Sequence, residues 1–78
     1  MKGDLKTVFG KTIKELRAAK GLTQQRLADY AGMDRAYISE LERGLLMPSL
    51  ETVFRLAEVL KIKPENLIEK TNAQFKSS

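Results

Sequence analysis

The stretch QQRLADYAGMDRAYISELERG, residues 24–44, places small and apolar residues at constrained intervals. Ala28, Gly32 and Ile38 are its fifth, ninth and fifteenth residues. Two helices that cross at about 90–120° through a short turn need a small residue at their contact and a turn residue that accepts a positive φ. Ala28 meets the first requirement and Gly32 the second. The spacing therefore predicts two helices packed across a tight turn.

The residues that flank this turn mark where its two helices begin and end. Thr23 is a good N-cap for a helix over residues 24–31, which Gly32 would end. Asp34 is a good N-cap for a second helix over residues 35–43, which Gly44 would end. The other inward positions are filled by Leu27, Ala31, Met33 and Leu41. This pattern is a helix-turn-helix.

The rest of the chain shows helical periodicity, without strand-like alternation or repeats. We expect a first helix that ends at Gly21, a loop at LLMPS, a fourth helix capped by Ser49 and a fifth helix from Pro64. Their inward residues are Leu5, Phe9, Ile13 and Leu16 on the first helix, Val53, Leu56, Ala57 and Leu60 on the fourth, and Leu67 and Ile68 on the fifth. The sequence predicts a compact all-α domain of five helices over residues 1–70 and a short frayed tail over residues 71–78.

Length and composition limit the classes of protein that the chain can belong to. A chain of 78 residues suffices for one small domain. It has no Cys or His, which removes disulfides, thiolate sites and the commonest metal ligand, so we expect no cofactor and no metal. No apolar run could span a membrane, and the charged start MKGDLKTVFG does not fit a signal peptide. We expect a cytoplasmic protein without membrane contact.

The net charge of +4 is unevenly distributed along the chain. Residues 1–26 hold seven basic and two acidic residues, whereas the remainder holds seven basic and eight acidic ones. An excess of positive charge at one end of the chain fits a polyanionic partner.

The motif and its surroundings resemble a known family. From about Phe9 to Ile68 the sequence is similar to lambda-repressor-type helix-turn-helix proteins of the Cro/C1 or XRE group, most specifically in IKELRAAKGLTQQRLADYAGM and YISELERGLLMPSLETVFRLAEVL. The string DRAYISELERG is especially similar to the controller proteins of restriction-modification systems. Arg26 stands where the family often has Glu, so Thr23 would cap its helix without a reciprocal capping box.

The resemblance implies a regulator that binds double-stranded DNA, with its third helix in the major groove. Arg35 would read guanine, Ala36 could contact only a thymine methyl, and Ser39 and Glu40 would face the groove one turn further on. The implied backbone contacts are Thr23, Gln24, Tyr37 and Arg43. For each of these residues an ordinary solvated surface role is the alternative, and Lys11, Lys14 and Arg26 are further phosphate candidates.

Two structural roles accompany the resemblance. Arg17 and Glu42 occupy positions where the family forms a partly buried ion pair between the first and third helices. A homodimer is expected because one recognition helix reads too few base pairs to select a genomic site. Its interface would lie on the fifth helix at Leu67 and Ile68, with Leu60 or Phe75 as further candidates, although core packing also explains these residues.

Enzymatic function is not expected, because the chain has no Gly-rich phosphate loop and no paired carboxylate motif, and Ser39 has no His to activate it. An antitoxin-like module that uses the same fold to bind a partner protein stays open as the alternative to a DNA-binding regulator. Without an appended sensor domain we expect no small-molecule effector.

Overall fold

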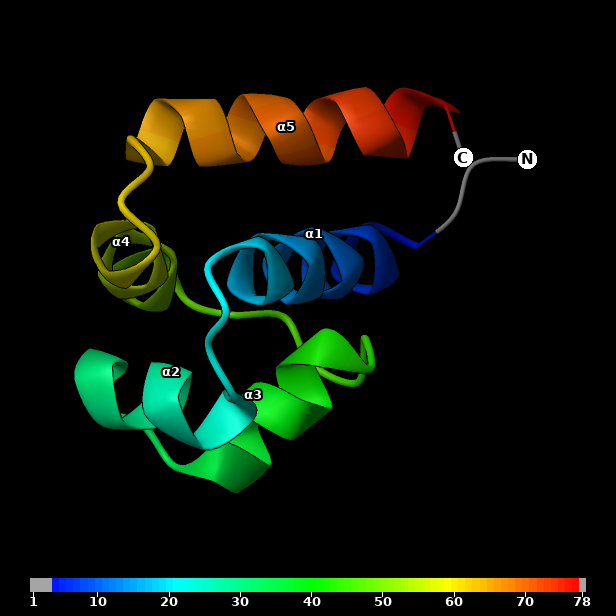
Figure 1. Cartoon of the computed structure of the whole chain (residues 1–78). Helices are drawn as coiled ribbons and strands as arrows, with labels where there is room; N and C mark the ends of the chain where they lie inside the picture. Colours follow the sequence, from blue (N-terminus) through cyan, green and yellow to red (C-terminus); the bar gives the residue numbers. More distant parts are fainter. Residues whose placement is uncertain (1–3, 78) are drawn as a thin grey trace.

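The computed structural model describes residues 4–77, which form five helices joined by short loops (Figure 1). The helices are α1 (Leu5–Ala19), α2 (Gln24–Ala31), α3 (Arg35–Glu42), α4 (Leu50–Val59) and α5 (Pro64–Ser77). No strand occurs among these residues, so the predicted all-α class and helix order are confirmed. Residues 1–3 of the predicted domain and residue 78 of the predicted tail lie outside the described part.

Three helices begin with side-chain capping hydrogen bonds, two of which, at Thr23 and Ser49, the sequence predicts. The backbone N–H of Arg26 donates to the Thr23 hydroxyl at 3.0 Å, and that of Thr52 donates to the Ser49 hydroxyl at 3.1 Å. At α1 the Asp4 carboxylate accepts from a backbone N–H. Asp34 occupies the predicted N-cap position of α3, although its side chain makes no capping hydrogen bond.

Left-handed residues follow the helices and turn the chain. Gly21, Gly32 and Gly44 have φ values of 70°, 69° and 74° after α1, α2 and α3. After α4 the same conformation is adopted by Lys61, with φ 56°. Glycine tolerates this region because it has no Cβ, whereas a lysine there is strained.

The core lies where all five helices meet. In Figure 1, α1 lies between α5 above it and α3 below it, while α4 is seen nearly end-on beside α2. Each helix contributes large apolar residues to it, and the largest apolar side chains that are less than 2% exposed are Ile13, Leu27, Ile38, Leu41, Leu56, Leu60 and Leu67. No helix within residues 4–77 has both the length and the apolar character that crossing a bilayer requires.

Residues 71–77 correct the expectation of a frayed tail, because they continue α5. Thr71 is buried, and its hydroxyl donates to the Leu67 carbonyl at 2.8 Å. The Gln74 amide donates to the Thr12 hydroxyl and to the Glu15 carboxylate on α1, both at 3.1 Å. The last two turns are therefore held against α1 in part by polar contacts, which the apolar periodicity of the sequence does not reveal.

Candidate nucleic-acid interface

α3 presents a polar face to solvent and an apolar face to the core. Ile38 and Leu41 are 0% exposed and anchor the helix. The opposite face carries the predicted base-reading residues, of which Arg35, Ala36 and Glu40 are exposed and Ser39 is half-buried. In Figure 1 α2 and α3 lie together at the lower edge of the molecule, on the side away from α5. An uncovered polar helix face of this kind can enter the major groove.

The turn between α2 and α3 sets the direction of α3. Gly32 follows α2 in the left-handed conformation, and the N–H of Met33 donates to the Ala28 carbonyl at 2.8 Å. Ala28 is 0% exposed, as expected for a small residue at the helix contact. The helix-turn-helix predicted from these positions is therefore confirmed.

The N-terminus of α2 is the predicted anchor on the DNA backbone. The first N–H groups of a helix have no intrahelical acceptor and favour anions, so those of Gln24 and Gln25 suit a phosphate. The Thr23 hydroxyl is occupied by the N–H of Arg26, which leaves this hydroxyl its own proton to donate. Of the other predicted backbone contacts, Arg43 is exposed, while Tyr37 is half-buried against the core.

A buried polar network joins α1, α2 and α3 behind this interface. Arg17 donates to both carboxylate oxygens of Glu42, from Nε to Oε2 at 2.7 Å and from Nη2 to Oε1 at 3.0 Å. Its Nη1 donates to the Leu22 carbonyl at 2.8 Å. The side chains of Arg17 and Glu42 are 14% and 2% exposed, so the ion pair implied by the resemblance is present and buried. The hydrogen bond to Glu42 raises the pKa of Arg17 further above its ordinary value, against the lowering effect of burial.

Gln24 belongs to the same network, which sequence reasoning did not foresee. Its Nε2 donates to Glu42 Oε1 at 3.0 Å. The side-chain amide is therefore held by the buried carboxylate, and one Nε2 hydrogen and the Oε1 atom remain for an outside partner. The network thus fixes the residue at the start of α2 relative to α3.

Gly10 is a second residue that the sequence reading missed. A Cβ at this position would overlap the carbonyl oxygen of Leu41 and lie 3.0 Å from that of Glu42. α1 and the end of α3 therefore approach with backbone against backbone, which places Arg17 within reach of Glu42. A signal was available, because a glycine inside a helix costs about 1 kcal/mol relative to alanine and usually has a packing reason.

The charged residues in and around α3 are of both signs, and further positive charge lies outside this helix. Residues 34–43 hold two basic and three acidic residues. Arg35 and Arg43 form no ion pair with any residue from 4 to 77, so both guanidinium groups are available to an external anion. Lys11, Lys14 and Arg26 are exposed and add positive charge outside α3. No group of acidic side chains in the described part of the chain could hold a metal ion.

The predicted dimer interface needs correction. Leu67 is 0% exposed and Leu60 is 1% exposed, so both belong to the core of one subunit. Ile68 is 49% exposed and stays available. Successive residues of a helix point about 100° apart, so the rotation of α5 that buries Leu67 in the core turns Ile68 toward solvent.

Comparisons with known proteins agree with this architecture. The family model HTH_3, described as helix-turn-helix, matches residues 13–67. The SPbeta prophage-derived HTH-type transcriptional regulator YonR of Bacillus subtilis is 37% identical over 68 residues, which cover 87% of this chain and 63% of YonR. The chain thus spans less than two thirds of the length of that relative.

Two solved structures are also similar. The restriction-modification controller protein C.AhdI from Aeromonas hydrophila matches with a TM-score of 0.77 and 44% identity, covering 80% of this chain and 94% of C.AhdI. The biofilm regulator SinR, solved in complex with DNA, matches with a TM-score of 0.73 and 33% identity. That match covers 77% of this chain and 97% of the SinR chain.

Proposed function

Because the chain belongs to the HTH_3 helix-turn-helix family, it is a DNA-binding transcriptional regulator, and we propose that it reads a palindromic operator in the major groove as a homodimer. The observation that carries this proposal is the exposed polar face of α3 beside the N-terminus of α2. In this arrangement α3 can read bases while the N-terminus of α2 binds phosphate. Control of a restriction-modification system is the narrower role that the likeness to C.AhdI supports.

In the proposed complex Arg35 is the principal base reader. It is the first residue of α3, it is exposed, and its guanidinium can donate to guanine O6 and N7 together. Ala36, Ser39 and Glu40 complete the base-reading face. Thr23, Gln24, Tyr37 and Arg43 contact the backbone and set the register of the helix.

We expect Arg35→Ala to weaken binding to the preferred operator by about 1–3 kcal/mol and to relax the preference at one base pair per half-site. Arg43→Ala is the matched control, because it removes the same charge from a residue assigned to phosphate. It should weaken binding to all duplexes similarly and lower the salt slope by about one unit. The measurement is binding of each variant, over a salt series, to an operator selected from random DNA and to a scrambled duplex.

Equal losses on both duplexes for Arg35→Ala would instead make Arg35 a backbone contact. Sequence reading would then fall to Ser39, Glu40 or the shape of the DNA. If the selection from random DNA yielded no preferred site while a second protein co-purified with the chain, the antitoxin-like alternative would replace the regulator proposal.

The homodimer requires an apolar surface, and α4 and α5 supply one. Leu50 and Phe54 lie one turn apart on α4 and are 69% and 54% exposed. Phe54 lines a shallow hollow with Pro64, and Ile68 lines a second one with Met47, Pro48 and Val53. We define Leu50, Phe54 and Ile68 as the α4–α5 patch. A second copy of the chain is its proposed occupant, because reading a palindrome requires two recognition helices related by a two-fold axis and about 34–36 Å apart.

We expect Phe54→Glu to shift the chain to monomer and to reduce operator affinity at least tenfold, because each half-site complex then loses its neighbour. Ala18→Glu adds the same charge at an exposed position of α1 and should leave association unchanged. Sedimentation equilibrium at micromolar concentrations, with and without operator DNA, measures both. A wild-type chain that stays monomeric in both conditions would contradict the dimer.

A further inference from the structure

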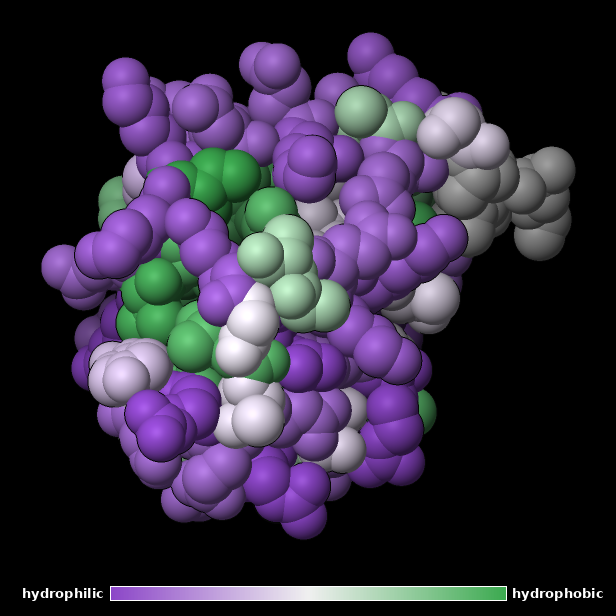
Figure 2. Space-filling view, in the orientation of Figure 1, coloured by the Kyte–Doolittle hydropathy of each residue, from purple (hydrophilic) through white to green (hydrophobic). Residues whose placement is uncertain are grey.

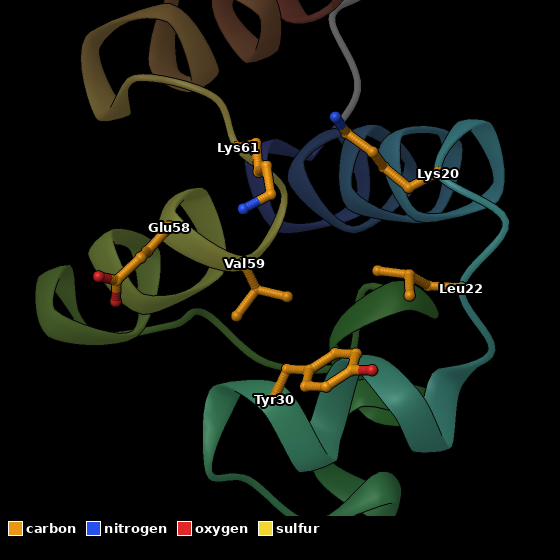
Figure 3. A pocket seen from close by; sticks show the side chains of 6 residues that line it. All are labelled: Lys20, Leu22, Tyr30, Glu58, Val59 and Lys61. Carbon is orange, nitrogen blue, oxygen red and sulfur yellow. The ribbon is translucent and has the colours of Figure 1, made fainter.

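A hollow of about 420 Å³ lies where the C-terminal ends of α1 and α4 meet α2 (Figure 3). It belongs neither to the proposed DNA interface nor to the α4–α5 patch. Its lining residues are Lys20, Leu22, Tyr30, Glu58, Val59 and Lys61. A volume of this size suits a small organic molecule, since ligand pockets usually measure about 300–1,000 Å³.

The floor of the hollow is apolar. In Figure 3 the methyl groups of Leu22 and Val59 point into the same space, above the ring of Tyr30. Leu22 and Val59 are half-buried, while Tyr30 is 60% exposed although it is a large aromatic residue. Figure 2 shows apolar surface reaching solvent over α4 on this side of the molecule, within a largely polar surround. The floor can therefore pack against the apolar part of a small molecule.

The rim carries two cationic groups without counter-charges. In Figure 3 the ammonium group of Lys61 points toward Val59 on the apolar floor, whereas the ammonium group of Lys20 and the carboxylate of Glu58 are directed away from it. Neither lysine forms an ion pair with any residue in the described part of the chain. Arg26 adds positive charge close by, with its Nη1 3.4 Å from the Tyr30 hydroxyl. The rim thus favours an anion.

The backbone at Lys61 gives an independent reason to single out this rim. Lys61 is the only non-glycine residue with positive φ among residues 4–77, whereas glycine occupies the equivalent position after α1, α2 and α3. Glycine would relieve the strain after α4 as well. Strained conformations of this kind concentrate at functional sites, and here the strain keeps a cationic side chain at the mouth of the hollow.

We propose that this hollow binds a small organic anion, with its carboxylate at the Lys61 ammonium and its apolar body on Leu22, Val59 and Tyr30. Such a ligand would stand against the sequence-based expectation of no small-molecule effector. The bound ligand would contact α2 of the helix-turn-helix together with the C-terminal ends of α1 and α4. The binding step does not depend on the operator or on the dimer, so its test is separate from the tests of the proposed function.

Hexanoate is a suitable probe because it combines one carboxylate with a short apolar chain. We expect titration of the ¹⁵N-labelled chain with hexanoate to shift the backbone amide signals of Leu22, Tyr30, Val59 and Lys61 in a saturable manner. Acetate lacks the apolar body and hexan-1-ol lacks the charge, so each should bind at least tenfold more weakly. Shifts of equal size with hexan-1-ol, or no localised shifts with hexanoate, would overturn the proposal.

Lys61→Gly is the decisive variant. It removes the ammonium group and the strain together, so we expect a higher thermal midpoint and about tenfold weaker hexanoate binding. Lys70→Ala, which removes one exposed positive charge from α5, should leave hexanoate binding unchanged. Unchanged hexanoate binding in Lys61→Gly, or an equal loss in Lys70→Ala, would show that the rim does not recognise the anion.

Discussion

Replacing Arg17 by methionine should lower the free energy of unfolding by about 3–5 kcal/mol, because it leaves the carboxylate of Glu42 buried without its counter-ion. That carboxylate is only 2% exposed, and the Gln24 amide would be its remaining partner. Methionine keeps much of the aliphatic volume of arginine, so the loss reports the charge rather than a cavity. Urea denaturation monitored by circular dichroism measures it, provided that the m-value stays constant.

The double variant Arg17→Met/Glu42→Leu is the control for this effect. It removes both charges and keeps apolar volume, and such replacements of buried ion pairs are often neutral or even stabilising. We therefore expect the double variant to recover most of the stability that Arg17→Met loses. If the two substitutions instead destabilised the chain additively, Arg17 and Glu42 would not be coupled, and Arg17 would become a candidate for DNA contact.

The coupling also has a consequence for DNA binding. Glu42 holds the side chain of Gln24 at the start of α2 through the 3.0 Å hydrogen bond from Nε2 to Oε1. Loss of the carboxylate frees the Gln24 side chain, whose ordering then costs conformational entropy on binding. A buried pair far from the base edges thus contributes to the positioning of the proposed phosphate contact.

Gly10→Ala should lower the free energy of unfolding by about 3 kcal/mol or more. This is a large loss, because the free energy of unfolding of a small domain can be as low as about 5 kcal/mol. The new methyl group would overlap the carbonyl oxygen of Leu41, and backbone cannot rotate away as a side chain can. α1 and α3 would have to separate, which would also strain the Arg17–Glu42 pair. Thermal and urea denaturation measure the loss.

The sign of this effect is decisive, because alanine inside an unobstructed helix gains about 1 kcal/mol over glycine. A stabilised Gly10→Ala variant would contradict the close approach of α1 and α3. Gly32→Ala is the comparison, since a Cβ at Gly32 meets nothing within 4 Å and only the φ of 69° opposes it. That variant should lose about 1–2 kcal/mol, which separates backbone strain from steric overlap.

Local chemistry explains why most of the fold could be predicted from the sequence. Thr23 and Ser49 cap the helices that they were expected to cap, and Gly32 adopts the predicted left-handed turn. These features depend on residues within four positions along the chain. The same holds for the positions of Arg35 and Glu40 on the outer face of α3, which follow from helical periodicity.

Contacts between distant residues account for what the sequence could not decide. The last turns of α5 are held against α1 in part by the hydrogen bonds of Gln74 to Thr12 and Glu15, about sixty residues away in the chain. Likewise, whether Leu67 or Ile68 faces outward depends on the rotation of α5 against the core.

Sequence alone determined the five helices, the turn at Gly32 and the identity of the outward residues on α3, because capping, periodicity and positive φ are properties of neighbouring residues. Only the tertiary structure decided that Gly10 is a contact between backbones, that Gln24 joins the buried pair and that Lys61 stands at the rim of a hollow. Each of these depends on which helices approach one another and how closely, since packing rather than local propensity fixes their separation.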